Sequence, residues 1–311
     1  MTTKQLDDKS LGQYTAYPSS FEKPEFNSQT DMAEVISVVN QKGGVGKTTT
    51  TVNLASGLSE IGQSVLVIDF DAQMNSTKWM LGRETDEDEA SIFDCLETVA
   101  GDESEEFSIA ELAEDSGAGF DFIPSGEDMI ANTFDSTVGR SGAYPNQLRV
   151  RIEEMETGFE EDVISTPNGP YDYCLMDCSP SLGRSIMVAL VGSDSILVPV
   201  SADGFSMQGL NQLLSTIREV RINNSDLEIV GILANNLDLR SGLVKDMEEA
   251  LRDRYEELMF ETSIPWRSKI NEVTTLGTYL KDHAPASDAR DFYRDLAEEV
   301  VERTREPAVA K

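Results

Sequence analysis

The chain has 311 residues, with 57 acidic and 25 basic side chains, and its formal net charge is −32. A chain of this length buries enough apolar surface to fold as one domain without disulfides. Its three cysteines form no C-x-x-C pair and it has a single histidine, which argues against metal-cluster chemistry and histidine-based hydrolysis. No apolar run approaches the ~20 residues that a membrane helix needs, and the amino terminus lacks a signal-peptide core. We therefore expect a cytoplasmic protein whose cysteines are buried.

The acidic excess has two explanations. It could mark an acidic interaction protein that avoids nucleic acid, or a protein of a salt-in halophile, whose acidic surface keeps it soluble at molar salt. We favour the halophile because the acidic residues are spread over the chain rather than gathered in one tail. At molar salt the Debye length falls to ~3 Å. The net charge therefore does not exclude DNA as a partner.

Apolar runs alternate with helical patterns from Glu34 onward. Residues 1–33 are polar and aperiodic, which predicts a disordered extension, and residues 306–311 are expected to form a short tail. Between them, the alternation predicts a single α/β domain over 34–305, with a mostly parallel, twisted sheet and helices on both faces. The expected strands lie within 35–40, 64–73, 120–125, 171–181, 193–201, 227–236 and 259–265. The expected helices are 47–62, 206–220, 243–258 and 290–302, and the acidic stretch 84–119 is expected to carry short solvated helices.

The segment QKGGVGKT, residues 41–48, follows the first expected strand and opens a helix. It matches the P-loop pattern G-x-x-x-x-G-K-[ST] except that Gln41 replaces the first glycine and Lys42 adds a second lysine. Its glycines let backbone amides approach phosphates, while Lys47 is expected to bridge the β- and γ-phosphates and Thr48 to bind Mg²⁺. The expected phosphate-binding segment comprises Gly43, Gly44, Val45, Gly46, Lys47, Thr48 and Thr49.

Carboxylates end two other expected strands. Asp177 closes the apolar run YCLM, as expected for an acidic residue that binds the Mg²⁺ of a P-loop. Asp69 and Asp71 lie two apart, on one face of an extended chain. Carboxylates beside a nucleotide can orient an attacking water. These strands therefore predict a magnesium ligand and a candidate for water activation, and together with the loop they predict a P-loop NTPase.

Three segments, NQKGGVGKTTT, VIDFDAQMNST and YDYCLMDCSPSLG, resemble the deviant Walker ATPases of the ParA/MinD superfamily, and most of all ParA. Later segments follow the order and spacing of ParA over roughly residues 34–305. The resemblance implies a Mg²⁺-dependent ATPase that forms ADP and phosphate and dimerises on ATP. It also implies that Lys42 reaches the ATP of the partner subunit, that Asp71 positions the hydrolytic water and that Asp69 supports the P-loop region.

The same resemblance places residues near the base. Asn236, or Asn235, and Pro265 are expected to lie near adenine. The segment NNLD, 235–238, is also similar to the guanine motif NKxD, but Asn236 stands in place of its lysine. This difference favours ATP over GTP.

Basic residues in the last third of the chain are candidates for DNA contacts. Arg240 and Lys269 match positions at which the family carries DNA-contacting arginines, and Arg267 is adjacent. The alternative is that each is a solvated surface charge. Trp266, and lysine rather than arginine at position 269, depart from the usual sequence of the family.

The last helical pattern separates possible functions within the superfamily. MinD-type members end in a basic amphipathic helix that binds membrane, but here the apolar stripe lies on a helix with more acidic than basic residues. We expect it to pack on the core, with no stable membrane binding. The stripe consists of Ala289, Tyr293, Leu296, Ala297 and Val300. Iron–sulfur carriers are also disfavoured, because they need paired cysteines.

The resemblance to ParA implies a partitioning ATPase. Such a protein is a homodimer on ATP, binds DNA non-specifically, associates with the nucleoid and is released when a ParB-like partner or cargo adaptor stimulates hydrolysis. Two alternatives remain open: a ParA-like ATPase that positions a protein cargo, and a MinD-like membrane-associated regulator.

Overall fold

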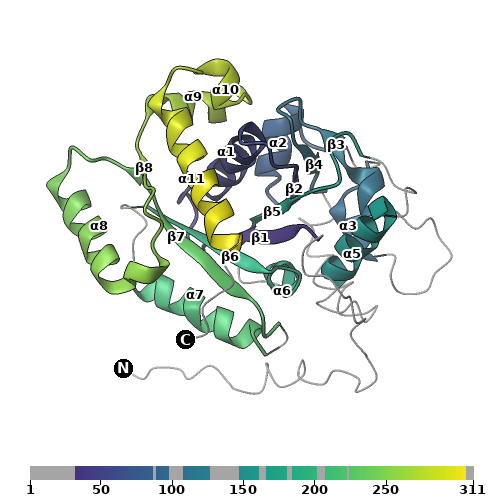
Figure 1. Cartoon of the computed structure of the whole chain (residues 1–311), viewed down its shortest axis with the longest axis horizontal. Coiled ribbons are helices and arrows are strands. Elements are labelled where there is room, and N and C mark those ends of the chain that lie inside the picture. The colour runs from purple at the N-terminus through teal and green to yellow at the C-terminus, as the bar shows by residue number, and fades with distance from the viewer. Residues whose placement is uncertain are drawn as a thin grey trace. The chain divides into compact units, whose positions relative to one another are not determined.

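The computed structural model of the chain describes residues 32–86, 89–97, 108–126, 147–160, 166–180, 184–201, 207–222 and 224–305 (Figure 1). The predicted extension, 1–33, lies outside these residues apart from Met32 and Ala33, and so does the predicted tail, 306–311. The domain boundaries therefore stay a prediction.

Eight strands of the described residues form one sheet in the order β3-β4-β2-β5-β1-β6-β7-β8. The pairs are parallel except for β3 and β4, as the predicted fold requires. The strands are β1 (Glu34–Val38), β2 (Val65–Phe70), β3 (Glu114–Asp115), β4 (Asp121–Ile123), β5 (Tyr173–Cys178), β6 (Ser195–Ser201), β7 (Glu228–Leu237) and β8 (Ile264–Pro265).

Helices cover both faces of the sheet (Figure 1). One face packs against α3, α5, α6, α7 and α8, and the other against α1, α2, α9, α10 and α11. The helices are α1 (Lys47–Glu60), α2 (Asn75–Leu81), α3 (Ile92–Glu97), α5 (Gln147–Glu160), α6 (Arg184–Val191), α7 (Met207–Val220), α8 (Gly242–Tyr255), α9 (Ser268–Leu276), α10 (Leu280–His283) and α11 (Asp288–Arg305). This is the predicted α/β fold.

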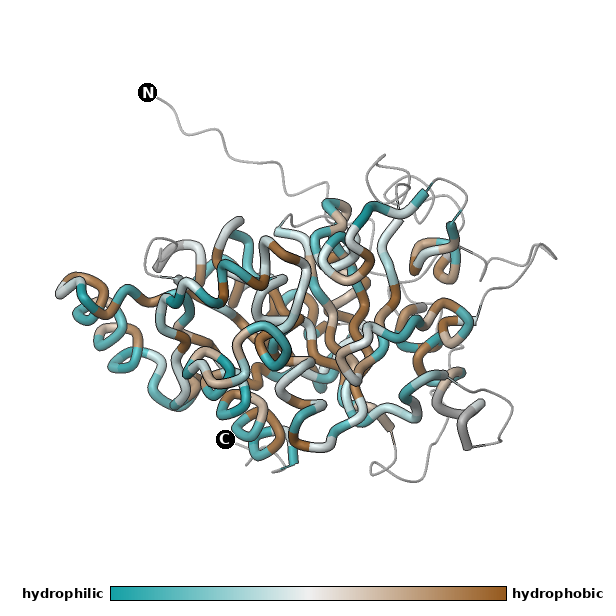
Figure 2. Tube along the Cα trace, turned by 90° about the horizontal axis from the view of Figure 1, so that it is seen from above, coloured by the Kyte–Doolittle hydropathy of each residue, from teal (hydrophilic) through white to brown (hydrophobic). Residues whose placement is uncertain are grey.

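Alternate residues of the inner strands serve the two faces. In β2, Leu66 and Ile68 belong to one apolar core, while Val65 and Val67 belong to the other. All of them are fully buried, which explains why the strand reads as a continuous apolar run. Figure 2 shows the hydrophobic residues concentrated along the central strands and the hydrophilic residues on the outer helices. The three cysteines are buried, as predicted.

Helix α11 packs against α1. The five residues of its predicted apolar stripe are all buried, so the prediction that the stripe faces the core is confirmed. The two helices approach closely at Gly57, where an added Cβ would lie 2.6 Å from the backbone oxygen of Tyr293. None of the helices in the described part of the chain combines the length and apolar composition that crossing a bilayer requires.

The sheet topology brings three loops together at one edge. Strand β1 pairs with β5 on one side and with β6 on the other, while α1 carries the chain past β5 to β2. In open α/β sheets, ligands bind outside the carboxyl ends of the strands at such a switch in strand order. The carboxyl ends of β1, β2 and β5 lie at this edge, and the predicted phosphate loop, Asp69, Asp71 and Asp177 lie at or just after them.

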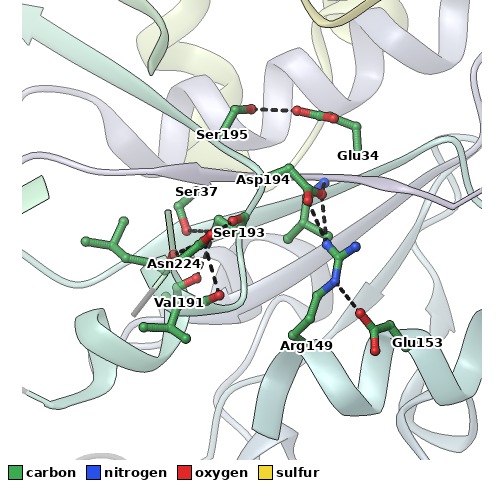
Figure 3. A network of polar contacts seen from close by, with 12 residues as sticks. Glu34, Ser37, Arg149, Glu153, Val191, Ser193, Asp194, Ser195 and Asn224 are labelled. Carbon is green, nitrogen blue, oxygen red and sulfur yellow. Dashed lines mark hydrogen bonds and ion pairs between the residues drawn. The ribbon is translucent and has the colours of Figure 1, made fainter. Parts of the chain in front are cut away.

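The opposite edge of the sheet holds a polar network (Figure 3). Arg149 of α5 donates two hydrogen bonds of 2.9 Å to the carboxylate of Asp194, which also accepts one of 2.9 Å from the backbone nitrogen of Val35. The Ser195 hydroxyl donates to Glu34 at 2.8 Å. These contacts tie the amino ends of β1 and β6 to α5.

Glu34 gives stability a predicted pH dependence. Burial, and then the charge of Asp194, raise the pKa of its carboxyl from 4.5 to about 7. The folded state therefore keeps a proton that the unfolded state releases above pH 4.5, so this group's stabilising contribution is lost as the pH rises to about 7. Glu34→Gln, which cannot ionise, is expected to be the more stable chain above pH 7, by on the order of 1 to 3 kcal/mol.

Denaturant unfolding of both chains at acidic and alkaline pH measures this difference. We expect equal stability at acidic pH and a gain for Glu34→Gln at alkaline pH. Glu302→Gln, on the exposed face of α11, is the control for loss of one charge. A Glu34→Gln chain that is less stable than the unaltered chain at alkaline pH would contradict the prediction.

Candidate nucleotide site

The loop between β1 and α1 has the backbone of an anion site. Gly44 and Gly46 have φ values of 76° and 88°, a left-handed conformation that residues with a Cβ avoid. An added Cβ on Gly46 would also lie 2.4 Å from Nδ2 of Asn235. At Gly43 and Gly44, an added Cβ would have no described atom within 4 Å. At Gly46 the loop therefore packs against Asn235. At Gly43 and Gly44 its backbone is open, so phosphates can approach the backbone amides.

Lys47 is a buried cation at the start of α1. Its side chain nitrogen lies 3.5 Å from the backbone oxygen of Lys42, and the residue is only 8% exposed. Burial lowers the pKa of its ammonium, and the nearby carboxylates of Asp177 and Asp71 only partly oppose this effect. Phosphate groups in the loop would add negative charge and stabilise the charged lysine.

Asp177, at the end of β5, meets Thr48 of α1. The Thr48 hydroxyl donates to Oδ2 of Asp177 at 2.7 Å, and the Ser76 hydroxyl donates to the same oxygen. The other oxygen, Oδ1, is buried and accepts no hydrogen bond within the described part of the chain. Burial also raises the pKa of this carboxyl. A buried carboxylate with one free oxygen beside a hydroxyl fits a Mg²⁺ ligand set, because Mg²⁺ takes oxygen ligands and would offset the cost of burying the charge.

Asp71 lies in the loop between β2 and α2 and is 4% exposed. Its Oδ1 accepts from the backbone nitrogen of Gln73 at 3.1 Å, and its Oδ2 lies 3.5 Å from the Asn75 amide. Its charge raises the pKa of Lys47, against the effect of burial. The arrangement leaves Asp71 able to accept a hydrogen bond from a water beside the phosphates.

Asp69 is fully buried, and its contacts join the loop that carries Asp71 to the start of α2. It accepts from the backbone nitrogen of Asp71 at 3.0 Å, and from the backbone nitrogen and hydroxyl of Thr77 at 2.8 and 2.7 Å. Burial raises the pKa of its carboxyl. The sequence-based expectation was support of the P-loop region, whereas these contacts hold the neighbouring β2–α2 loop in shape.

Asn235, near the end of β7, is anchored to the phosphate loop. Its Nδ2 donates to the backbone oxygen of Val45 at 2.8 Å, and its Oδ1 accepts from the backbone nitrogen of Asn236 at 2.9 Å. The side chain is therefore buried behind the loop and holds Val45 in place. Asn236, which was expected to lie near adenine with Asn235 as the alternative, is exposed and has a left-handed φ of 55°.

Two hydroxyl residues at this site have no role assigned from the sequence. Ser76 shares the Thr48-bonded oxygen of Asp177, and Thr77 holds Asp69. Both lie in the segment VIDFDAQMNST, in which only the two aspartates were predicted as site residues. Ser76 and Thr77 stand at the start of a helix directly after the two aspartates, and this position is the sequence feature that could have indicated them.

Comparison with known proteins identifies the family. The model of the AAA domain family matches residues 33–229. The sporulation initiation inhibitor protein Soj of Bacillus subtilis is 33% identical over 271 residues, which are 87% of this chain and 99% of that protein. The chromosome partitioning protein ParA of Caulobacter vibrioides is 30% identical over 274 residues, 88% of this chain and 95% of that protein. The chain belongs to the ParA/MinD family of P-loop ATPases. The sequence-based predictions of the family, the fold and an ATPase are confirmed.

A solved structure agrees with this membership. This chain has a fold similar to that of cobyrinic acid a,c-diamide synthase from Mycobacterium smegmatis, whose crystal structure contains bound ADP and magnesium. The TM-score between the two is 0.70. The synthase is 25% identical, and the match covers 88% of this chain and 96% of that one. The cofactors predicted from the sequence, ATP and Mg²⁺, agree with the structures of that synthase, which hold magnesium with an ATP analogue or with ADP.

The lysine that marks the ParA/MinD pattern, Lys42, is exposed at the rim of the loop. Its backbone nitrogen donates to Oδ1 of Asn40 at 3.0 Å, and its backbone oxygen faces Lys47. Lys42 and Lys47 therefore differ in setting, since one is at the surface and the other is buried in the loop.

The expected adenine residues lie at the carboxyl ends of β7 and β8. Leu237 pairs with Pro265, and the backbone nitrogen of Trp266 donates to the oxygen of Leu237 at 2.9 Å. Asn236 and Pro265 are thus neighbours. Their contact with adenine stays a prediction.

The three expected DNA residues of the ParA/MinD-type chain are all ion-paired within it. Arg240 pairs with Asp238, Arg267 with Asp288 and Lys269 with Glu272, each at 2.7 Å at its shortest contact. Exposed pairs of this kind contribute little to stability and exchange readily. A phosphate could compete for these groups, but the pairs lower the local positive charge, and the DNA role stays a prediction.

Proposed function

We propose that the chain is a ParA-type partitioning ATPase that dimerises on ATP, binds DNA non-specifically and segregates plasmid or chromosomal DNA. The observation that carries the proposal is the phosphate loop, in which buried Lys47 lies near the charges of Asp71 and Asp177, Gln41 stands in place of the first glycine and exposed Lys42 adds a second lysine. The partitioning role is supported by relatives at 30% identity or more, which include a chromosome partitioning protein.

The chain's own residues provide the hydrolytic site. The backbone amides at Gly43 to Gly46, with Lys47, bind the phosphates. Mg²⁺ held by Thr48 and Asp177 would neutralise charge on the β- and γ-phosphate oxygens. Asp71 accepts a hydrogen bond from water and orients it to attack the γ-phosphorus, and the bond to the bridging oxygen then breaks to give ADP and phosphate.

Lys42 couples this site to a second copy of the chain. An exposed ammonium at the rim of one loop can reach phosphate oxygens bound by the partner subunit, so the dimer forms where ATP is present. The dimer binds DNA through phosphate contacts, with Arg240, Arg267 and Lys269 as candidates. A ParB-like protein or cargo adaptor then stimulates hydrolysis and releases the dimer.

The proposal has consequences for setting and organisation. The protein is cytoplasmic, nucleoid-associated when ATP is bound, and makes no stable contact with membrane. Residues 34–305 are the ATPase domain, and the extension and tail lie outside it. The net charge of −32 supports adaptation to high salt.

Replacing Lys42 with alanine tests the proposal. We expect ATP still to bind, because Lys47 and the loop amides remain, but ATP-dependent retention of DNA to be lost. Retention is measured with ATP, with ADP and without nucleotide over a series of salt concentrations, since phosphate contacts weaken as salt rises. Lys245→Ala, an exposed lysine of α8, is the matched control and is expected to behave as the unaltered chain.

Two results decide the outcome. Loss of retention in Lys42→Ala with ATP binding intact would support the dimer and the DNA role together. Equal retention by Lys42→Ala and the unaltered chain, or retention that does not depend on ATP, would contradict them.

The second candidate is a ParA-like ATPase that positions a protein cargo. This candidate has the same nucleotide site, but its dimer positions a protein cargo instead of segregating DNA. A MinD-like membrane regulator is less well supported, because the stripe of α11 is buried in the core. A pull-down with the Asp71→Ala chain and ATP, followed by identification of the retained partner, separates the first two.

A further inference from the structure

The carboxylate of Asp238, just after β7, is engaged on both oxygens by Arg240. The guanidinium donates to Oδ1 at 2.7 Å and to Oδ2 at 2.8 Å, and the Arg240 backbone nitrogen lies 3.2 Å from Oδ1. These hydrogen bonds lower the pKa of Asp238 to about 2, so the carboxylate is ionised. The guanidinium also lies over the Trp266 ring, 5.6 Å from its centroid. Arg240 is thus held by two neighbours.

This group lies on the nucleotide side of the sheet. Asn235, three residues before Asp238, contacts the phosphate loop directly through Val45. Strand β7 is separated from β1 by β6 alone, so its end lies about 10 Å from the start of the phosphate loop. A nucleotide whose phosphates lie in the loop extends along the carboxyl ends of the strands, and a base directed toward β7 would lie beside Asp238.

A free carboxylate here would select guanine. Guanine presents two adjacent donors, N1–H and the amino group, and an ionised carboxylate is an acceptor on both oxygens. Adenine presents its amino donor beside the N1 acceptor, which repels a second carboxylate oxygen. An unpaired Asp238 would therefore favour GTP over ATP.

We propose that Arg240 sets the base preference of the site by occupying both oxygens of Asp238, so that guanine finds no acceptor pair. The inference rests on the proposed function, since it requires a nucleotide in the phosphate loop. The pair is exposed, with side-chain exposures of 79% for Arg240 and 44% for Asp238. Guanine can compete for such a pair, so the effect of Arg240 is modest, on the order of tenfold in relative affinity.

The test compares the dissociation constants of ATP and GTP, with Mg²⁺ present, for the full-length chain and three variants. Arg240→Ala is expected to shift the ratio toward GTP, on the order of tenfold, because Asp238 becomes available. Asp238→Asn added to Arg240→Ala is expected to remove the shift, since the amide lacks the second acceptor. Arg83→Ala breaks a similarly exposed pair, with Glu89, and is expected to leave the ratio unchanged.

Each outcome bears on the inference. An unchanged ratio in Arg240→Ala, with ATP binding intact, would overturn it and leave the proposed function standing. A shift that persists in the double variant would also overturn it, because the carboxylate would not be the cause. Absence of nucleotide binding by the unaltered chain would instead overturn the proposed function. If Arg240→Ala lost only DNA retention, Arg240 would be a DNA contact and the base role would be wrong.

Discussion

Replacing Lys47 with alanine is expected to abolish ATP turnover and to weaken ATP binding strongly. Lys47 is buried at the start of α1, and the nearby carboxylates of Asp71 and Asp177 already supply negative charge there. Loss of one such electrostatic contact costs on the order of 10² to 10³ in rate. For Lys47→Ala we expect a loss of rate at the upper end of this range. Without the lysine, no ammonium would offset the repulsion between the phosphates and the carboxylates of Asp71 and Asp177.

The variant should still fold. Burial lowers the pKa of Lys47, which means that the folded chain without nucleotide holds the charged form at a cost. Removing the side chain relieves that cost, so thermal unfolding should remain cooperative. Calorimetric titration with ATP and steady-state phosphate release measure the loss, and Lys245→Ala is the control. Unchanged ATP affinity and turnover in a folded Lys47→Ala chain would contradict the assigned role.

Replacing Asp71 with asparagine is expected to separate binding from chemistry. Asparagine keeps an oxygen that can accept from Gln73, so the loop should hold its shape. It cannot take up a proton or bear the charge that orients water, and loss of such a group lowers kcat by on the order of 10² to 10⁴. ATP affinity should change little, since the loop amides and Lys47 remain.

Parallel measurements of ATP affinity and of kcat test this separation. Asp295→Asn, on the exposed side of α11, controls for loss of one carboxylate. A normal kcat in Asp71→Asn would exclude Asp71 as the residue that positions water. A loss of ATP affinity as large as the loss of kcat would show that Asp71 acts in binding instead.

The parts of the fold that depend on local pattern could be predicted from the sequence. The continuous apolar runs of β2, β5 and β6 indicated strands buried on both faces, and the stripe of α11 indicated a helix packed on the core. The phosphate loop could also be predicted, because its residues are contiguous. Each of these signals lies within one element.

Some boundaries depended on contacts between distant residues. The run 259–265 was expected to be one strand, but the structure has an isolated bridge at Met259 and a two-residue strand, β8. Between them, the backbone nitrogens of Glu261 and Thr262 donate to the side chain of Glu299 on α11, so they do not join the sheet. The local sequence pattern does not indicate that a carboxylate from another helix accepts hydrogen bonds from these backbone nitrogens.

The site shows the same limit. Asn235 reaches Val45 across 190 residues of chain, and the contact exists only because β7 lies one strand away from β1. The carboxylate partner of Arg267, Asp288, likewise lies 21 residues away in the chain, whereas Lys269 pairs with Glu272, three residues along the same helix. Residue types and spacing indicated Thr48 and Asp177, which the structure brings into hydrogen-bonding contact, but not Ser76 or Thr77. They could not predict which oxygen or nitrogen is already engaged.

The mass of the full-length chain in solution, measured by light scattering with ATP and Mg²⁺ and again with ADP and Mg²⁺, tests the ATP-gated dimer most directly. The Asp71→Asn chain is the sample of choice, because slow hydrolysis preserves the ATP-bound state. We predict twice the monomer mass with ATP and the monomer mass with ADP. The same mass with both nucleotides, in a chain that binds each of them, would contradict an ATP-gated dimer.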